Sequence, residues 1–125
     1  RLGTAKYDSV FLVLGYHDMF VKGDGWYFPA DVVMPQVLRS LKPGGKLLVI
    51  DHDTEKGRGT QDATGLHRIG SAFTKTDIEK RGFRLLKQSD ILVNKDDNHK
   101  LIVFDKKIRG KTDRFVMLFE KIDKK

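Results

Sequence analysis

The chain has 125 residues, no cysteine, and a formal charge of +7 from 24 Lys and Arg against 17 Asp and Glu. This length fits a single domain, 1–125, and the absence of cysteine excludes a disulfide framework, a thiolate zinc site and a cysteine nucleophile. The longest apolar run, Val10 to Leu14, is far shorter than the roughly 20 residues of a transmembrane helix, so no membrane partner is expected. Acidic residues are interleaved with the basic ones, which is typical of a solvated surface, so no nucleic-acid partner is expected either.

The first half of the chain predicts a strand, a helix and a second strand. Tyr7 to Leu14 ends in five consecutive apolar residues, as a strand buried on both faces does, and Lys46 to Ile50 repeats this pattern. Between them, Asp31 to Leu41 has apolar residues at helical spacing, and Lys42-Pro43-Gly44-Gly45 is a signal that ends the helix. Pro35 is tolerable if the helix starts near Asp31, because the first four N–H groups have no intrahelical partner. Such a unit places its two strands parallel.

The second half predicts one more helix and two more strands. The helix is expected at Thr74 to Arg81, where Thr74 and Asp77 approximate a capping box. The strands are expected at Phe83 to Leu92 and at Arg114 to Glu120. The connections 52–73 and 93–112 are long enough to be functional covers or disordered segments. The predicted fold class is therefore α/β, with a mixed sheet of about four strands and two helices.

Polar residues follow both apolar strands at their carboxyl ends, where open α/β sheets bind ligands. Gly15-Tyr16-His17-Asp18 follows the first strand, and Asp51-His52-Asp53 follows the second. If the third strand is parallel as well, both long loops lie at this edge. The loops then add further polar side chains, among them His67, Arg68, Asp96, Asp97, His99, Arg109 and Lys111. The candidate residues include all four histidines of the chain.

Each of these features also has a purely structural interpretation. A His-Asp dipeptide at a strand end often bonds nearby backbone groups. Trp26-Tyr27-Phe28 could stack on a planar ligand, but aromatic residues that lead into a crossover helix more often serve packing. Imidazole and carboxylate groups are suitable ligands for Zn, Fe or Mn, yet the sequence assigns no metal site. The residues that such a site would draw on are His17, Asp18, His52, Asp53 and His67.

The order of the motifs resembles class I S-adenosylmethionine-dependent methyltransferases. The run Leu38 to Asp51, with its LKPGG turn, is similar to the helix, turn and fifth strand of that family, and YDSVFLVLGYHD is similar to the fourth strand and the loop after it. Leu66-His67-Arg68, Arg81-Gly82-Phe83 and Ile108 to Phe115 resemble a bacterial subgroup of predicted methyltransferases. The resemblance covers essentially the whole chain and implies a partial Rossmann-like fold built from strands four to seven of the family.

The first half of the family, with its glycine-rich cofactor loop, has no counterpart in these 125 residues. The resemblance therefore implies the substrate-side half of a methyltransferase for a small-molecule substrate, inactive as an isolated chain and not expected to bind S-adenosylmethionine alone. Cofactor contacts carry over to Gly15, Tyr16 and His17, in the loop that borders the methyl-transfer centre. Candidates for a catalytic base are His17, Asp18 and His52. Candidate substrate contacts are Asp53, His67, Arg68, His99 and Arg109.

A self-sufficient module is the alternative: a metal-dependent hydrolase or a small ligand-binding domain that uses the His-Asp pairs. A start at Arg1 rather than Met is expected of a fragment, and the cytoplasm is only a default compartment, since an upstream signal lies outside the sequence. Without the first half of the family, the first strand becomes a sheet edge that is apolar on both faces. A homodimer is expected in which two copies of Tyr7 to Leu14 pair antiparallel.

Overall fold

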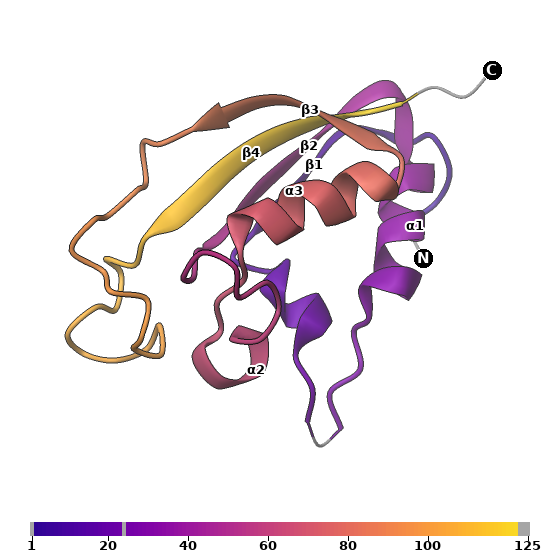
Figure 1. The fold of residues 1–125 in the computed structure, drawn as a ribbon. Helices are drawn as coiled ribbons and strands as arrows, with labels where there is room; N and C mark the ends of the chain where they lie inside the picture. The colour runs from indigo at the N-terminus through magenta and orange to yellow at the C-terminus, as the bar shows by residue number, and fades with distance from the viewer. Residues whose placement is uncertain (1, 24, 123–125) are drawn as a thin grey trace.

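The computed structural model describes residues 2–23 and 25–122, which form one mixed four-stranded sheet with helices packed on one face (Figure 1). The strand order is β1-β2-β4-β3; β1 is parallel to β2, and β4 is antiparallel to both of its neighbours. The carboxyl ends of β1, β2 and β3 therefore meet at one edge, as predicted. No helix in the described part is long and apolar enough to cross a membrane. The elements are β1 (Tyr7–Val13), the 3₁₀ helix η1 (His17–Phe20), α1 (Ala30–Ser40), β2 (Leu41–His52), α2 (Ala63–Leu66), α3 (Ser71–Lys80), β3 (Phe83–Ser89) and β4 (Arg114–Lys121).

The crossover helix is confirmed, but the explanation for its proline is wrong. Helix α1 begins at Ala30, so Pro35 is its sixth residue and lies beyond the four N–H groups that lack an intrahelical partner. The proline ring lies on the exposed side of the helix. The opposite side buries Ala30, Met34 and Val37 against the sheet, and this packing holds the helix despite one missing backbone donor.

The LKPGG segment ends α1 as predicted, but it is not a turn between the helix and the next strand. Leu41 is already paired with Tyr7 of β1, and the next pairs join Ser9 to Lys46 and Val10 to Leu47. The residues between Leu41 and Lys46 therefore form an irregularity within β2. Gly45 is required there, because an added Cβ would lie 2.9 Å from the Lys42 carbonyl oxygen.

Two predicted boundaries in the second half also change. Helix α3 starts at Ser71 rather than Thr74, and Thr74 is a buried helical residue whose hydroxyl donates to the Gly70 carbonyl instead of capping the helix. Strand β3 ends at Ser89 rather than Leu92. Two short helices were not predicted: η1, which follows β1, and α2, which lies within the long connection 52–73. Periodicity does not reveal helices of four residues.

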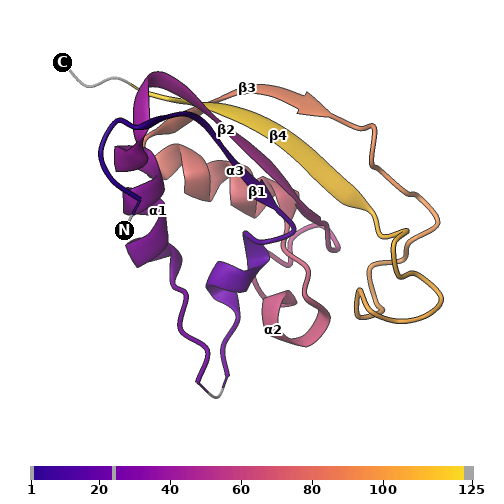
Figure 2. The ribbon, with the colours of Figure 1, turned by 180° about the vertical axis from the view of Figure 1, so that it is seen from behind.

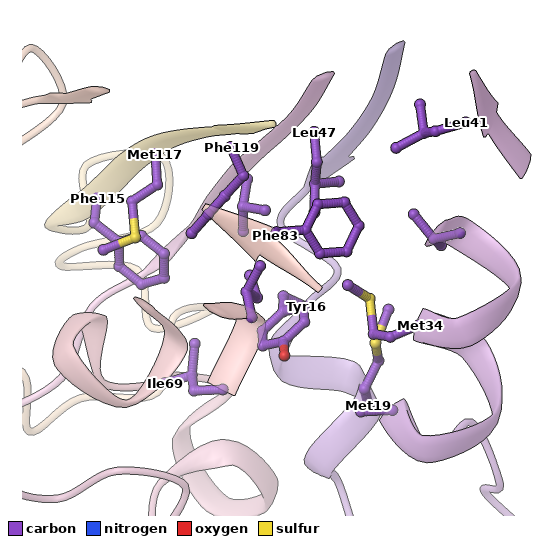
Figure 3. Packing of buried hydrophobic residues seen from close by; sticks show 14 residues of the cluster. Tyr16, Met19, Met34, Leu41, Leu47, Ile69, Phe83, Phe115, Met117 and Phe119 are labelled. Carbon is purple, nitrogen blue, oxygen red and sulfur yellow. The ribbon is translucent and has the colours of Figure 1, made fainter. Parts of the chain in front are cut away.

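The core lies between the sheet and its helices and fixes the loop that follows β1 (Figure 3). Alternate residues of β2 and β4 point into it, as do Met34 of α1 and the side chains of Tyr16 and Met19. Burial of each large apolar side chain stabilises the fold by about 1.5–3 kcal/mol. Since Tyr16 and Met19 flank His17 and Asp18, their burial anchors η1 at the sheet edge.

The opposite face of the sheet carries no helix in the described part of the chain (Figure 2). On that face of β1, Phe11 and Val13 are 65% and 55% exposed. They lie beside Leu48 and Ile50 of β2 on the same face. Strand β1 is an edge strand, so its outer N–H and C=O groups have no partner strand within the sheet.

Candidate functional site

His17 and Asp51 form a buried pair where β1 and β2 end. The two oxygens of the Asp51 carboxylate accept hydrogen bonds from the His17 backbone N–H and from its ring Nδ1, both at 2.7 Å. The His52 backbone N–H donates to the same carboxylate at 2.8 Å. Asp51 is fully buried and His17 is 4% exposed. Because an ionised carboxylate only accepts, Nδ1 of His17 carries its proton and Nε2 points away from the pair.

Asp18 and His67 lie on the Nε2 side of His17. The Asp18 carboxylate oxygen is 3.2 Å from Nε2, and its side chain is 35% exposed, so this side of the cluster opens to solvent. The half-buried His67 ring stands at 88° to the His17 ring, with 5.5 Å between the ring centroids. Its other neighbour is Phe104 of the 93–112 loop, at 5.1 Å. Both long loops therefore reach the edge at which the first strand ends, as predicted.

The pKa values of the two buried histidines are shifted in opposite directions. Burial opposes the charged form of His17, but the hydrogen bond and charge of Asp51, with the charge of Asp18, outweigh it and raise the pKa of His17. For His52, burial dominates and lowers its pKa to about 4. His52 is therefore neutral at pH 7, and its Nδ1 is engaged 2.6 Å from the Thr112 hydroxyl. Its low basicity makes it the weaker candidate for a catalytic base.

Arg68 is engaged in contacts within the fold. It is fully buried, and its guanidinium forms a two-pronged ion pair with Asp97 at 2.7 and 3.0 Å. Two further N–H groups, on Nη1 and Nε, donate to the carbonyls of Asp53 and Leu101. The pair joins the two long loops and leaves no N–H direction toward solvent. This geometry does not favour the substrate contact by Arg68, which stays a prediction.

Asp53 and His99 border a separate cleft of about 520 Å³ beside the start of α3. The Asp53 carboxylate accepts from the backbone N–H groups of Thr54 and Ser71. Burial raises the pKa of Asp53, although these two hydrogen bonds oppose the shift. His99 Nε2 lies 2.8 Å from the Asp113 carboxylate, so this imidazole is also engaged in the fold. Arg109 lies in an exposed turn, and none of its described side-chain contacts joins it to the His17 cluster.

Of the three predicted cofactor contacts, Tyr16 turns inward. Its side chain is fully buried, and its hydroxyl donates to Asp77 of α3. Burial and this neighbouring carboxylate raise the pKa of Tyr16. Gly15 is half-buried, and its carbonyl accepts from the Asp18 N–H at 3.2 Å as η1 begins. The structure therefore leaves the backbone of Gly15 and the ring of His17 for any ligand at this edge.

The aromatic segment before α1 does not pack into the core, contrary to the interpretation favoured from the sequence. Trp26, Tyr27 and Phe28 are 47%, 82% and 43% exposed. They line a shallow hollow of about 360 Å³ together with Asp18. The Trp26 indole N–H donates to the Asp18 carbonyl at 2.8 Å. An apolar surface therefore adjoins the polar cluster.

Asp51 was not among the predicted site residues, although its carboxylate holds His17 in place. A signal was present in the strand pattern. Leu47, Val49 and Asp51 point to the same face of β2 and are all fully buried. A carboxylate on the buried face of a strand is stable only when hydrogen-bond donors surround it. His17 supplies two of these donors, its backbone N–H and its ring Nδ1.

No protein-family model matches the chain, and no curated protein matches its sequence. Solved structures do match its fold. The [4+2]-cyclase SpnF aligns with a TM-score of 0.63 and 15% identity over 98% of this chain and 52% of SpnF. A candidate sarcosine dimethylglycine methyltransferase from Galdieria sulphuraria gives a TM-score of 0.58 and 20% identity, over 98% and 56% of the two chains. A candidate methyltransferase from Bacillus halodurans C-125 gives 0.57 and 15%, over 97% and 67%.

The chain has a class I methyltransferase-like fold, in the partial Rossmann-like form that its sequence predicts. It spans about half the length of SpnF and of the Galdieria protein. At identities of 20% or less these likenesses establish the fold alone. One of the matched proteins is a cyclase, so the reaction has to be argued from the site.

Proposed function

We propose that these 125 residues are the substrate-side half of an S-adenosylmethionine-dependent methyltransferase, and that the methyl acceptor binds beside His17. The observation that carries the proposal is the buried His17–Asp51 pair at the carboxyl ends of two parallel strands of this fold. Open α/β sheets bind their ligands at such an edge. The exposed aromatic segment next to Asp18 offers an apolar surface for the rest of a small acceptor.

The pair suits the needs of methyl transfer, in which the acceptor atom must be held in line with the donated methyl group. Asp51 fixes the tautomer and the ring plane of His17, so Nε2 presents a defined direction to an acceptor. A neutral His17 would take a proton from an acceptor hydroxyl or amine at Nε2. S-adenosylmethionine supplies the methyl group in the complete family, and the residues that hold its ribose and adenine there have no counterpart in this sequence.

Calorimetric titration of the isolated chain with S-adenosylmethionine tests the missing cofactor half. We expect no saturable binding. Fluorescence of Trp26, the single tryptophan of the chain, provides a second readout because its indole contacts the loop that carries Asp18. Micromolar binding at one site per chain would contradict the proposal and indicate a self-contained cofactor pocket.

A metal-dependent hydrolase remains the second candidate, because His17, Asp18 and His67 gather groups that can hold a metal ion. Hydrolysis of nitrophenyl acetate and nitrophenyl phosphate by the zinc-loaded chain separates the two. The methyltransferase proposal predicts no rate above that of free zinc. A rate that requires His67 would favour the hydrolase.

We also propose that the isolated chain forms a two-fold dimer through β1. Antiparallel pairing of two β1 edges would satisfy their outer backbone groups and close without further growth. Light scattering should give a dimer for the unmodified chain and a monomer for Phe11→Lys with Val13→Lys, whose side chains share the exposed face of β1. Val32→Lys with Ile91→Lys, at two exposed positions elsewhere, is the matched control. A monomeric unmodified chain would refute this assembly.

A further inference from the structure

We propose that His17, Asp18 and His67 bind a divalent first-row transition metal ion, and that Asp51 orients His17 for this role. The ligand atoms of the three side chains all lie within 4.8 Å of one another. Bonds of about 2.0–2.2 Å to a tetrahedral ion place neighbouring ligands about 3.4 Å apart, so the widest pair must close by about 1.4 Å at most. Asp18 and His67 are not fully buried and have the freedom for this movement.

Asp51 supplies the orientation that metal-binding histidines require. A metal-bound imidazole usually donates its other ring N–H to a carboxylate, which fixes the tautomer and raises the basicity of the ligating nitrogen. His17 already has this arrangement, since Nδ1 donates to Asp51 and Nε2 faces Asp18. Asp51 is itself held by the backbone N–H groups of His17 and His52. The ligating nitrogen is therefore aimed before any ion arrives.

His67 occupies a backbone conformation that is uncommon for residues other than glycine. It follows α2 with φ 56° and ψ 42°, in the left-handed region. For a residue other than glycine this region costs roughly 1–2 kcal/mol. Glycine would end the helix at lower cost, and Gly65 lies only two residues earlier. The histidine at this position brings its ring against His17, with 5.5 Å between the ring centroids.

The donor set defines the class of ion. Two imidazoles and one carboxylate suit Zn²⁺, Fe²⁺, Co²⁺ or Mn²⁺, whereas Ca²⁺ and Mg²⁺ prefer oxygen donors throughout. Three protein ligands leave at least one position open, which is typical of a site where water or a substrate oxygen binds. The partial exposure of Asp18 gives the ion a route in from solvent. If the proposed function holds, an acceptor oxygen would occupy the open position; the metal site itself does not depend on methyl transfer.

The site competes with a simpler state of the same residues. When a proton occupies Nε2, His17 is an imidazolium between Asp51 and Asp18. A metal ion replaces that proton, and Asp18 changes from hydrogen-bond acceptor to ligand. The two states use the same atoms, so direct binding measurements are required to distinguish them.

Titration of the full chain with ZnCl₂ by calorimetry, and with CoCl₂ by visible absorption, tests the proposal. We expect one ion per chain and the strong visible bands of low-coordinate Co²⁺. His67→Gly removes a ligand at a position where glycine favours the backbone, so the variant should stay folded by circular dichroism and lose saturable binding. Asp51→Asn should weaken binding by about 10–100-fold. His99→Gln, in the histidine paired with Asp113, should leave the affinity unchanged.

Absence of saturable binding to the unmodified chain would overturn the proposal. The proposal would also be overturned if His67→Gly bound the metal ion as tightly as the unmodified chain does. The same holds if His99→Gln lost as much metal affinity as His67→Gly. None of these readouts involves S-adenosylmethionine, so failure of the metal site and failure of the methyltransferase assignment would be separately visible.

Discussion

Two clusters at the same sheet edge use similar residues for different purposes. In one, Arg68 and Asp97 are 0% and 1% exposed in their side chains, and they bond each other and nearby backbone groups. In the other, His17 is closed on its Asp51 side and open on its Asp18 side, where 35% of a carboxylate side chain meets solvent. The first cluster joins two loops. In the second cluster, the groups that contact His17 on its Asp18 side can be exchanged for others. Residue type and position along the chain do not separate these roles, whereas the solvent exposure of the polar side chains does.

The largest expected effect is a loss of stability when the buried Arg68–Asp97 pair, here called the closed cluster, is broken. Arg68→Ala leaves the Asp97 carboxylate buried and without its ion partner, which typically costs 3–5 kcal/mol. Urea denaturation of the purified variant measures this loss. Lys75→Ala, which breaks an exposed pair with Glu79 one helical turn away, is the control and should change stability by less than about 1 kcal/mol. Similar small losses in both variants would show that Arg68 does not anchor the loops.

The closed cluster should also give the protein part of its acid sensitivity. Burial alone would raise the pKa of Asp97, but bonds from Arg68 and from the backbone N–H groups of Asp113 and His99 outweigh it, so its pKa is lowered. A lowered pKa in the folded state contributes stability above the unfolded value of about 3.9, and this stability is lost as the pH falls through the folded value.

Urea midpoints of the unmodified chain and of Asp97→Asn should therefore differ most near pH 6 and converge toward pH 3. Glu79→Gln, at an exposed carboxylate on α3, should follow the unmodified chain throughout. A difference between the unmodified chain and Asp97→Asn that does not change with pH would mean that the charge of Asp97 contributes nothing.

A smaller difference in stability is expected between two variants at His67. Because its backbone is left-handed, His67→Gly should be more stable than His67→Ala by about 1 kcal/mol. Thermal or urea unfolding measures the difference in stability between the two variants. Because both variants lack the imidazole, its loss does not contribute to this difference. If His67→Ala were the more stable variant, the left-handed backbone at this position would not destabilise a residue other than glycine. One argument for His67 as a ligand would then be lost.

The sequence predicted the parts of the fold that depend on apolar periodicity. Both parallel strands, the crossover helix and the last strand follow from alternation or helical spacing, and the edge at which the polar residues meet follows from strand direction. Element ends were less accurate. The start of α3 was misplaced because Thr74 imitates a capping residue while its hydroxyl bonds within the helix.

The sequence predicted a set of residues for the candidate site. It did not predict which of them form buried pairs within the fold and which stay open to a ligand. His17, Asp18 and His67 do meet, but Arg68 beside His67 is buried in an ion pair with a residue 29 positions away. Such pairing depends on how two long loops fold over each other, and neither loop has a periodic pattern. Asp51 was overlooked because its role depends on a neighbour that arrives from a different strand end.

Long-range ¹H–¹⁵N correlation spectra of the four imidazoles, recorded with and without one equivalent of Zn²⁺, test the central distinction most directly. The account predicts that the ring nitrogens of His17 and His67 shift on addition of zinc, with Nδ1 of His17 still protonated. The rings of His52 and His99, which are engaged by Thr112 and Asp113, should remain as they were. Unchanged signals from His17 and His67, or equal shifts at all four histidines, would contradict it.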